Sequence, residues 1–142
     1  MNSVPCFTGF LRGELLDTFS QWGEKPFRTQ QIWSWIHVKL ATEIDEMTDI
    51  SKEFRQRLKE NFRFCRPTIR TRQQSQDHTV KWLLELADGL CVESVFIPEE
   101  DRGTLCVSSQ VGCSLSCPFC HTGTQRLARN LTAAEIVGQV IL

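Results

Sequence analysis

Apolar side chains recur at helical spacing through residues 8–62, with two interruptions. A first helix is expected to stop near Gly23, because glycine is common just after a helix. Pro26 suits the first turn of a second helix, and Asp49 or Ser51 is expected to cap a third. The pattern predicts a small helical bundle.

The apolar stripes of these helices supply the predicted core. Trp33 falls on the stripe of the second helix and is expected to pack inside, whereas Trp35 lies off that stripe and its place stays open. The stripe residues are Phe10, Leu11, Leu15, Leu16, Phe19, Ile32, Trp33, Ile36, Leu40, Phe54, Leu58 and Phe62.

In the middle of the chain the apolar pattern becomes alternating, as in strands. Residues 79–86 and 90–97 are predicted to pair as a β-hairpin, since Asp88-Gly89 between them is a strong tight-turn signal. Residues 104–109 are a further short strand, and residues 110–131 are expected to form a loop.

A capping box at Thr132-Ala-Ala-Glu135 predicts a last helix. This helix is expected to run to Leu142, because no stop signal follows the capping box. The chain is therefore expected to end inside an element, as a fragment or a truncated product would.

The net charge of −1 hides a basic block. Residues 51–81 carry nine basic and three acidic side chains, whereas residues 82–101 carry six acidic and no basic ones. Such a block suggests an anionic partner such as nucleic acid. On the charge pattern alone, a solvated surface with acidic counter-charges nearby is the simpler explanation. No apolar run is long enough to cross a membrane and no secretory signal is visible, so a cytoplasmic protein is expected.

The chain has seven cysteines. An odd number without a secretory signal argues against a disulfide framework. Cys113, Cys117 and Cys120 follow the spacing C-x3-C-x2-C, which lets three thiolates of one loop hold a single inorganic centre. In a [4Fe–4S] cluster, three cysteines leave one iron open to a chelating ligand such as S-adenosylmethionine. The alternative is a zinc-binding, RNA-interacting module with Cys106 or His121 as the fourth ligand.

Six short motifs around and upstream of these cysteines carry a more specific signal. They are GEKPFR at 23–28, DEMTD at 45–49, VESVFIP at 92–98, TLCVSSQVGC at 104–113, HTGTQ at 121–125 and RNLT at 129–132. In this order they resemble the RlmN/Cfr family of radical-SAM RNA methyltransferases, and RlmN more than Cfr. The resemblance extends from residue 11 to the last residue.

The resemblance implies an α+β fold that leads into α/β. Residues 1–64 would form a helical N-terminal domain that contacts RNA, and residues 65–103 a linker with the β-hairpin. Residues 104–142 would supply the first strand, loop and helix of a partial (β/α)6 radical-SAM barrel. A monomer is expected.

The resemblance also implies the reaction. Enzymes of the RlmN type methylate C2 of an adenine in 23S ribosomal RNA and of adenine 37 in some transfer RNAs, using a [4Fe–4S] cluster and two molecules of S-adenosylmethionine. Enzymes of the Cfr type act at C8, and only the resemblance favours C2 for this chain. One molecule methylates a cysteine of the enzyme, and the other yields a 5′-deoxyadenosyl radical that activates this methyl group. A reductase or a flavodoxin-type protein is expected to donate the electron.

By position, the resemblance makes Cys113, Cys117 and Cys120 the cluster ligands. Cys106 resembles the cysteine that closes a transient disulfide, and Glu93 resembles the proton acceptor near the target base. On the residues alone, a buried strand cysteine and a polar hairpin residue are the simpler interpretations of these two positions. The cysteines that match no functional position are Cys6, Cys65 and Cys91. The basic residues expected to contact RNA are Lys52, Arg55, Arg57, Lys59, Arg63 and Arg66, followed by Arg70 and Arg72.

Part of the family's machinery has no counterpart in these residues. The methyl-carrying cysteine lies far toward the C-terminus in such enzymes, and no cysteine follows Cys120. Residues 1–142 alone are therefore expected to be inactive, and residues 104–142 to fold poorly, because one strand and one helix cannot close a barrel. A radical-SAM enzyme with a substrate other than RNA is a further alternative, which the basic block disfavours.

Overall fold

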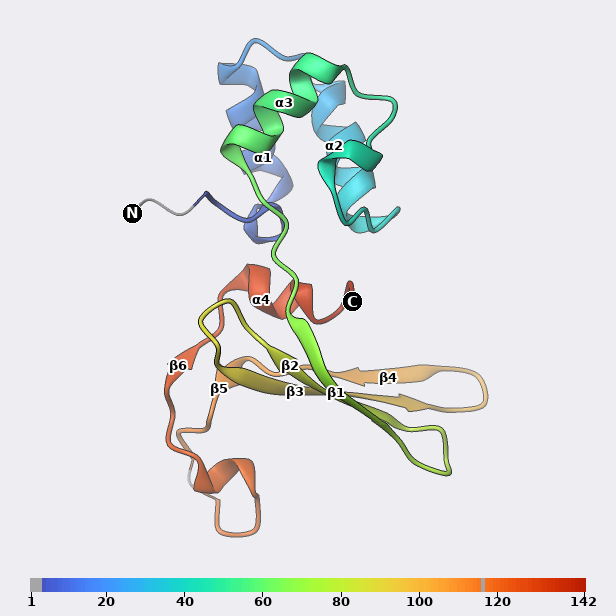
Figure 1. The fold of residues 1–142 in the computed structure, drawn as a ribbon, viewed down its shortest axis with the longest axis vertical. Coiled ribbons are helices and arrows are strands. Elements are labelled where there is room, and N and C mark those ends of the chain that lie inside the picture. The colour runs from blue at the N-terminus through green and yellow to red at the C-terminus, as the bar shows by residue number, and fades with distance from the viewer. Residues whose placement is uncertain (1–3, 116) are drawn as a thin grey trace. The chain divides into compact units, whose positions relative to one another are not determined.

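The computed structural model describes residues 4–115 and 117–142. The chain forms two compact units (Figure 1), one of the residues up to Cys65 and one of those from Arg66 to Val140. The first unit is helical, and the second is built around a β-sheet. Within the described residues, no helix has the length and apolar character needed to cross a membrane.

The three predicted helices of the first unit are present. Their bounds are Arg12–Gln21 for α1, Phe27–His37 for α2 and Lys52–Asn61 for α3, with short 3-10 helices η1 at Phe7–Gly9 and η2 at Ile44–Glu46. Pro26 is the N-cap of α2, directly before its first helical residue. The expectation that Leu40 continues the apolar stripe of α2 is wrong, because α2 ends at His37 and Leu40 is 43% exposed.

The cap of α3 and the place of Trp35 are related. Ser51 is the cap, and its hydroxyl oxygen accepts a hydrogen bond from the backbone N–H of Phe54 at 3.3 Å. Asp49, the other cap candidate, accepts a hydrogen bond from Nε1 of Trp35 at 2.6 Å. The ammonium of Lys39 lies 3.5 Å from the centroid of the Trp35 ring. The Trp35 ring therefore has two partners within the first unit, Asp49 at its N–H edge and Lys39 over one face.

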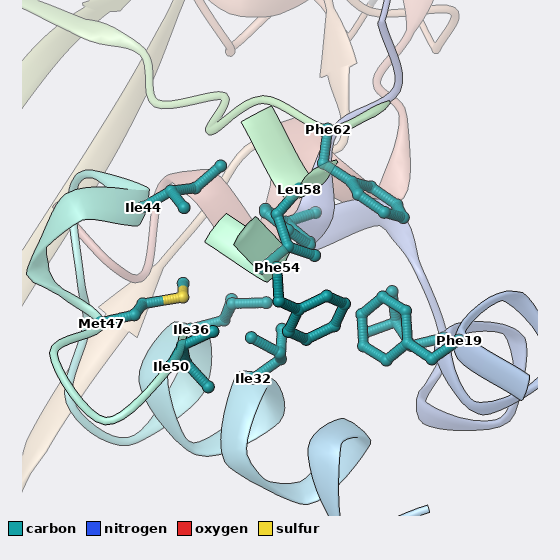
Figure 2. Packing of buried hydrophobic residues seen from close by; sticks show 11 residues of the cluster. Phe19, Ile32, Ile36, Ile44, Met47, Ile50, Phe54, Leu58 and Phe62 are labelled. Carbon is teal, nitrogen blue, oxygen red and sulfur yellow. The ribbon is translucent and has the colours of Figure 1, made fainter. Parts of the chain in front are cut away.

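The core of the first unit is rich in aromatic rings (Figure 2). Phe7, which lies outside the predicted helices, is fully buried and stacks on Phe62 with ring centroids 4.4 Å apart and planes 11° apart. Phe19 meets Phe54 and Phe62 edge-on. Trp33 packs against the cluster while partly buried. Burying one such side chain stabilises the fold by roughly 1.5–3 kcal/mol, so this core holds the helices together.

One disulfide lies within the described residues, between Cys6 and Cys65, whose Cα atoms are 5.7 Å apart. The sequence argued against a disulfide framework and matched neither cysteine to a functional position, so this single bond was not predicted. The backbone explains the proximity: the N–H of Phe7 donates to the carbonyl of Arg63, and the N–H of Arg63 donates to the carbonyl of Pro5, both at 3.0 Å. The segment before α1 thus lies alongside the segment after α3.

The second unit contains a four-stranded antiparallel sheet with strand order β1-β2-β3-β4. The strands are β1 at Thr68–Gln74, β2 at Val80–Glu85, β3 at Cys91–Pro98 and β4 at Gly103–Cys106. The predicted hairpin is β2–β3, and the N–H of Leu90 donates to the Asp88 carboxylate in its turn. The strand expected at residues 104–109 ends at Cys106 and joins this sheet beside β3.

The remaining elements of the second unit are short. They are β5 at Gln110–Val111, η3 at Thr122–Thr124, β6 at Arg129–Asn130 and α4 at Ala133–Gly138. Thr132 caps α4 as predicted, but the helix ends at Gly138 with Gln139 as its C-cap, well before the predicted end. The loop expected at residues 110–131 is closed at its base, where β5 pairs with β6. The buried cluster of this unit is Leu84, Leu86, Val92, Val111 and Leu131.

Candidate active-site face and cysteine loop

The sheet of the second unit has an open face that carries polar side chains. Residues directly opposite each other on antiparallel strands project to the same face, as do alternate residues along one strand. The pairs Gln73↔Lys81, Lys81↔Val95 and Val95↔Cys106 therefore form one row across all four strands. The adjacent row on the same face is Thr71, Leu83 and Glu93.

This register brings Glu93 and Cys106 together. Glu93 is two residues from Val95, the partner of Cys106, so the two are diagonal neighbours across β3 and β4. Diagonal neighbours in such a sheet are roughly 7–8 Å apart. Glu93 is half exposed, and Cys106 is an exposed, free thiol. The interpretation of Cys106 as a buried strand cysteine is therefore wrong, and both side chains face solvent.

An open pocket lies on this face beside Glu93. Leu83 forms an apolar part of its wall, and Thr71 and Gln73 add a hydroxyl and an amide. The fifth lining residue is Lys81, whose Nζ lies 2.7 Å from Oε1 of Glu93. Lys81 was not predicted from the sequence as a site residue, although its place between Val80 and Trp82 on an alternating strand indicates the polar face.

A buried amide supports the backbone beneath Glu93. The side chain of Gln139 is 4% exposed, and its Oε1 accepts hydrogen bonds from the Ser94 hydroxyl at 2.8 Å and from the Ser108 N–H at 2.9 Å. Its Nε2 donates to the carbonyl of Ser108 at 2.8 Å. The Ser108 hydroxyl in turn donates to the Glu93 carbonyl at 2.7 Å. These bonds tie the end of α4 to the strand that carries Glu93.

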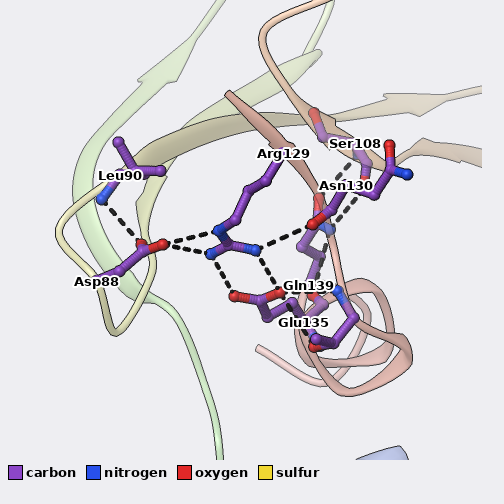
Figure 3. A network of polar contacts seen from close by, with 8 residues as sticks. Asp88, Leu90, Ser108, Arg129, Asn130, Glu135 and Gln139 are labelled. Carbon is purple, nitrogen blue, oxygen red and sulfur yellow. Dashed lines mark hydrogen bonds and ion pairs between the residues drawn. The ribbon is translucent and has the colours of Figure 1, made fainter. Parts of the chain in front are cut away.

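Arg129 joins the hairpin turn to the start of α4 (Figure 3). Its guanidinium makes two hydrogen bonds to the Glu135 carboxylate, at 2.7 and 2.9 Å, and contacts the Asp88 carboxylate at 2.6 Å. The Arg129 hydrogen bonds lower the pKa of Glu135 from its ordinary 4.5 to about 2, and they also lower the pKa of Asp88. The two carboxylates raise the pKa of Arg129. The base of the cysteine loop is thereby held at β6.

The three predicted cluster cysteines lie in the loop that β5 and β6 close. Cys113 follows β5, and its N–H donates to the carbonyl of Gln125 at 3.2 Å. The N–H of Cys120 donates to the carbonyl of Cys117, also at 3.2 Å. All three thiols are free and partly buried. The two ends of the loop thus lie side by side, and the three cysteines follow one another along the loop between them.

Two glycines permit the close packing of this loop. Gly112 has φ +77°, and a Cβ there would lie 2.2 Å from the carbonyl oxygen of Arg126. A Cβ on Gly123 would lie 2.6 Å from the carbonyl oxygen of Cys117. A larger residue at either position would force the backbone apart, since these distances are far below van der Waals contact.

The donor set of the loop fits an iron–sulfur cluster chemically, because three free thiols come from one short segment. In the part of the chain that the structure describes, however, no three side chains of His, Cys, Asp or Glu are gathered as they would be around a metal ion. The four-cysteine set of the zinc alternative is likewise not assembled there.

Several of the basic residues expected to contact RNA have partners within the first unit. Lys59 pairs with Asp45 at 2.7 Å, and Arg55 donates to the Asp45 backbone carbonyl at 3.0 Å. Arg57 donates to the Trp22 carbonyl at 3.1 Å and lies over its ring. The others in this unit are Lys52, at the start of α3, and Arg63, after its end; both are exposed. Arg66, Arg70 and Arg72 belong to the second unit, before and on β1.

Comparison with known proteins supports the resemblance seen in the motifs. Residues 7–64 match the family described as the ribosomal RNA large subunit methyltransferase N-terminal domain. The chain is 58% identical over 135 residues to the dual-specificity RNA methyltransferase RlmN of Magnetococcus marinus, covering 94% of the chain and 38% of that protein. It is 53% identical over 148 residues to the protein of the same name from Rhodopseudomonas palustris, covering 97% of the chain and 37% of that protein.

A solved structure agrees with these relatives. The chain matches a radical SAM methyltransferase from Sphaerobacter thermophilus with a TM-score of 0.88 and 36% sequence identity, covering 96% of this chain and 40% of that one. The chain thus spans a little over a third of the length of the relatives it matches. Nearly all of the chain is therefore similar to part of the proteins named RlmN, and its residues 7–64 belong to the family of ribosomal RNA large subunit methyltransferase N-terminal domains.

Proposed function

We propose that this chain is part of a radical-SAM enzyme that methylates C2 of adenine in 23S ribosomal RNA and in transfer RNA. The observation that carries the proposal is the adjacency of Glu93 and Cys106 on an open face of the sheet. That sheet belongs to the same compact unit as the loop of three free thiols. The names of the relatives, dual-specificity RNA methyltransferases, agree with an RNA substrate.

Cys113, Cys117 and Cys120 would hold the [4Fe–4S] cluster. With S-adenosylmethionine bound, the cluster supplies the one-electron chemistry that the non-nucleophilic C2 carbon of adenine requires. Gly112 and Gly123 lie on either side of these ligands in the sequence, and their close backbone contacts permit the tight packing of the loop. A reductase or flavodoxin-type protein would supply the electron.

Glu93 and Cys106 would act on the RNA side of the reaction. The carboxylate of Glu93 would take the proton that leaves C2 of the adenine. This carboxylate is exposed beside an open pocket, so a nucleobase can reach it. The bond between the methyl-carrying cysteine and the transferred carbon would then break, and the released sulfur would form a disulfide with the Cys106 thiolate. The transferred carbon would take up a proton to become the product methyl group, and the one electron left over would return to the cluster. The methyl-carrying cysteine has no counterpart in residues 1–142, so we propose that these residues alone do not complete a turnover.

RNA binding would involve the basic residues around α3 and β1. Lys52 and Arg63 are exposed and suit contacts with the phosphates of RNA. Proteins hold folded RNA mainly through such charge contacts and through its shape. Lys59 and Arg57 already have partners in the protein, so their contribution would require an exchange of those contacts. The target adenine would leave its stack to reach the sheet face.

The test combines anaerobic reconstitution with an RNA assay. The chain is reconstituted with iron and sulfide, and its absorption and EPR spectra are recorded before and after addition of S-adenosylmethionine. We expect a brown species that Cys117→Ala abolishes and Cys91→Ala preserves, Cys91 being an exposed cysteine outside the loop. In the full-length protein, Glu93→Gln and Cys106→Ala should abolish 2-methyladenine formation. A colourless protein that retains one zinc, or full activity of both variants, would contradict the proposal.

A further inference from the structure

The pocket beside Glu93 contains an ion pair that the proposed reaction does not yet use. Lys81 on β2 reaches across to β3, and its Nζ lies 2.7 Å from Oε1 of Glu93. The register explains the contact, because Leu83 pairs with Glu93 and Lys81 precedes Leu83 by two residues on the same face. Lys81 and Cys106 therefore flank Glu93 from the two neighbouring strands, both at diagonal positions.

Folding stability gives little reason for this pair. The side chains of Lys81 and Glu93 are 46% and 50% exposed, and ion pairs at such exposure contribute little to the free energy of folding. The effect of the contact is instead on conformation. A glutamate on an open strand face has three rotatable side-chain bonds, and one short contact to a neighbouring ammonium restricts them.

We infer that Lys81 is a positioning residue that holds the Glu93 carboxylate at the pocket in the orientation that proton transfer requires. This inference rests on the proposed role of Glu93. A general base must lie within hydrogen-bond reach of the proton that it takes, and a small misplacement is costly in rate. The ammonium contacts the carboxylate from the β2 side, where Thr71, Gln73 and Leu83 complete the pocket wall. A planar nucleobase that covers this wall excludes water and so strengthens the ion pair between Lys81 and Glu93.

The kinetic test uses the full-length protein and three variants. Lys81→Met removes the charge and keeps most of the side-chain volume, Lys81→Arg keeps the charge, and Arg102→Met is the matched control. Arg102 pairs with Glu99 in an exposed ion pair at the turn between β3 and β4, outside the pocket. We expect Lys81→Met to lower kcat by about tenfold or more with little change in the KM for RNA. Lys81→Arg should recover most of kcat, and Arg102→Met should match the parent.

The outcomes separate this inference from the proposed function. A parent protein that forms no 2-methyladenine under reconstitution contradicts the proposed function. An active parent with an unchanged kcat in Lys81→Met overturns the positioning role. A rise in KM with unchanged kcat also overturns it, because Lys81 would then contribute to RNA binding and not to the orientation of Glu93.

A second measurement does not depend on activity. The side-chain carboxyl 13C signal of Glu93 is recorded by NMR in the parent chain and in the Lys81→Met, Lys81→Arg and Arg102→Met variants. We expect Lys81→Met to move this signal, Lys81→Arg to leave it near the parent position, and Arg102→Met to have no effect. A Glu93 signal that is the same in Lys81→Met as in the parent would overturn the inference, whatever the kinetics show.

Discussion

Stability of the second unit should fall steeply in acid because of Glu135. Arg129 lowers the pKa of Glu135 from 4.5 to about 2 through two hydrogen bonds, and only about a fifth of the Glu135 side chain is exposed. Each pH unit between the folded and unfolded pKa is worth about 1.4 kcal/mol, so the full difference corresponds to about 3 kcal/mol. Partial solvent screening reduces the expected value to roughly 2–3 kcal/mol.

The sign follows from the direction of the change in pKa. A carboxyl group whose pKa is lower in the folded state stabilises that state above its unfolded pKa, here 4.5. The stabilisation is lost as the pH falls from about 4.5 to about 2, when the folded protein also takes up the proton. The lowered pKa of Asp88, caused by the same guanidinium, adds to the loss in the same direction.

The assay is urea unfolding at several pH values, followed through the amide NMR signals of Val111 and Leu131, which report on the second unit. The parent should lose about 2–3 kcal/mol of unfolding free energy over this pH range. Glu135→Gln should be less stable near neutral pH and should depend less on pH. The control, Glu99→Gln, removes a carboxylate from an exposed pair and should keep the parent slope. Equal slopes for Glu135→Gln and the parent would refute the reasoning.

Three further predictions concern the cysteine loop, the aromatic core and the disulfide. Gly123→Ala should reduce iron incorporation and destabilise the loop by about 1–3 kcal/mol, because the new methyl group would lie 2.6 Å from the Cys117 carbonyl oxygen; iron analysis after reconstitution checks this, and normal iron content would contradict it. Phe62→Ala should cost the first unit about 3–5 kcal/mol, since its ring is 4% exposed and contacts four other aromatic rings; urea unfolding followed by tryptophan fluorescence measures it. Dithiothreitol should lower the Tm of the oxidised parent but not of Cys6→Ser. The disulfide between Cys6 and Cys65 closes a loop with a sequence separation of 59 and so adds up to about 4 kcal/mol to the free energy of unfolding. An unchanged parent Tm would show that the bond does not contribute.

Local sequence signals predicted the elements that depend on neighbouring residues. The helices of the first unit, the β2–β3 hairpin and the Thr132 cap follow from apolar period, turn residues and capping residues within a few positions of each other. Strand β1 was not predicted, because all seven of its residues are exposed and no apolar alternation marks them. The cap of α3 shows the limit of such signals. Asp49 and Ser51 are equivalent candidates until the position of Trp35 assigns Asp49 another partner.

The sequence by itself determined the helical unit, the hairpin and the family resemblance, and it singled out the loop of three cysteines. These features depend on residue types a few positions apart, so the order of residues along the chain is enough to predict them. Only the tertiary structure decided that Cys106 lies beside Glu93, that Lys81 reaches the same carboxylate and that Cys6 meets Cys65. Each of these contacts depends on which strand or segment pairs with which, and in what register. That choice is made by the burial of the whole unit and not by the residues nearby.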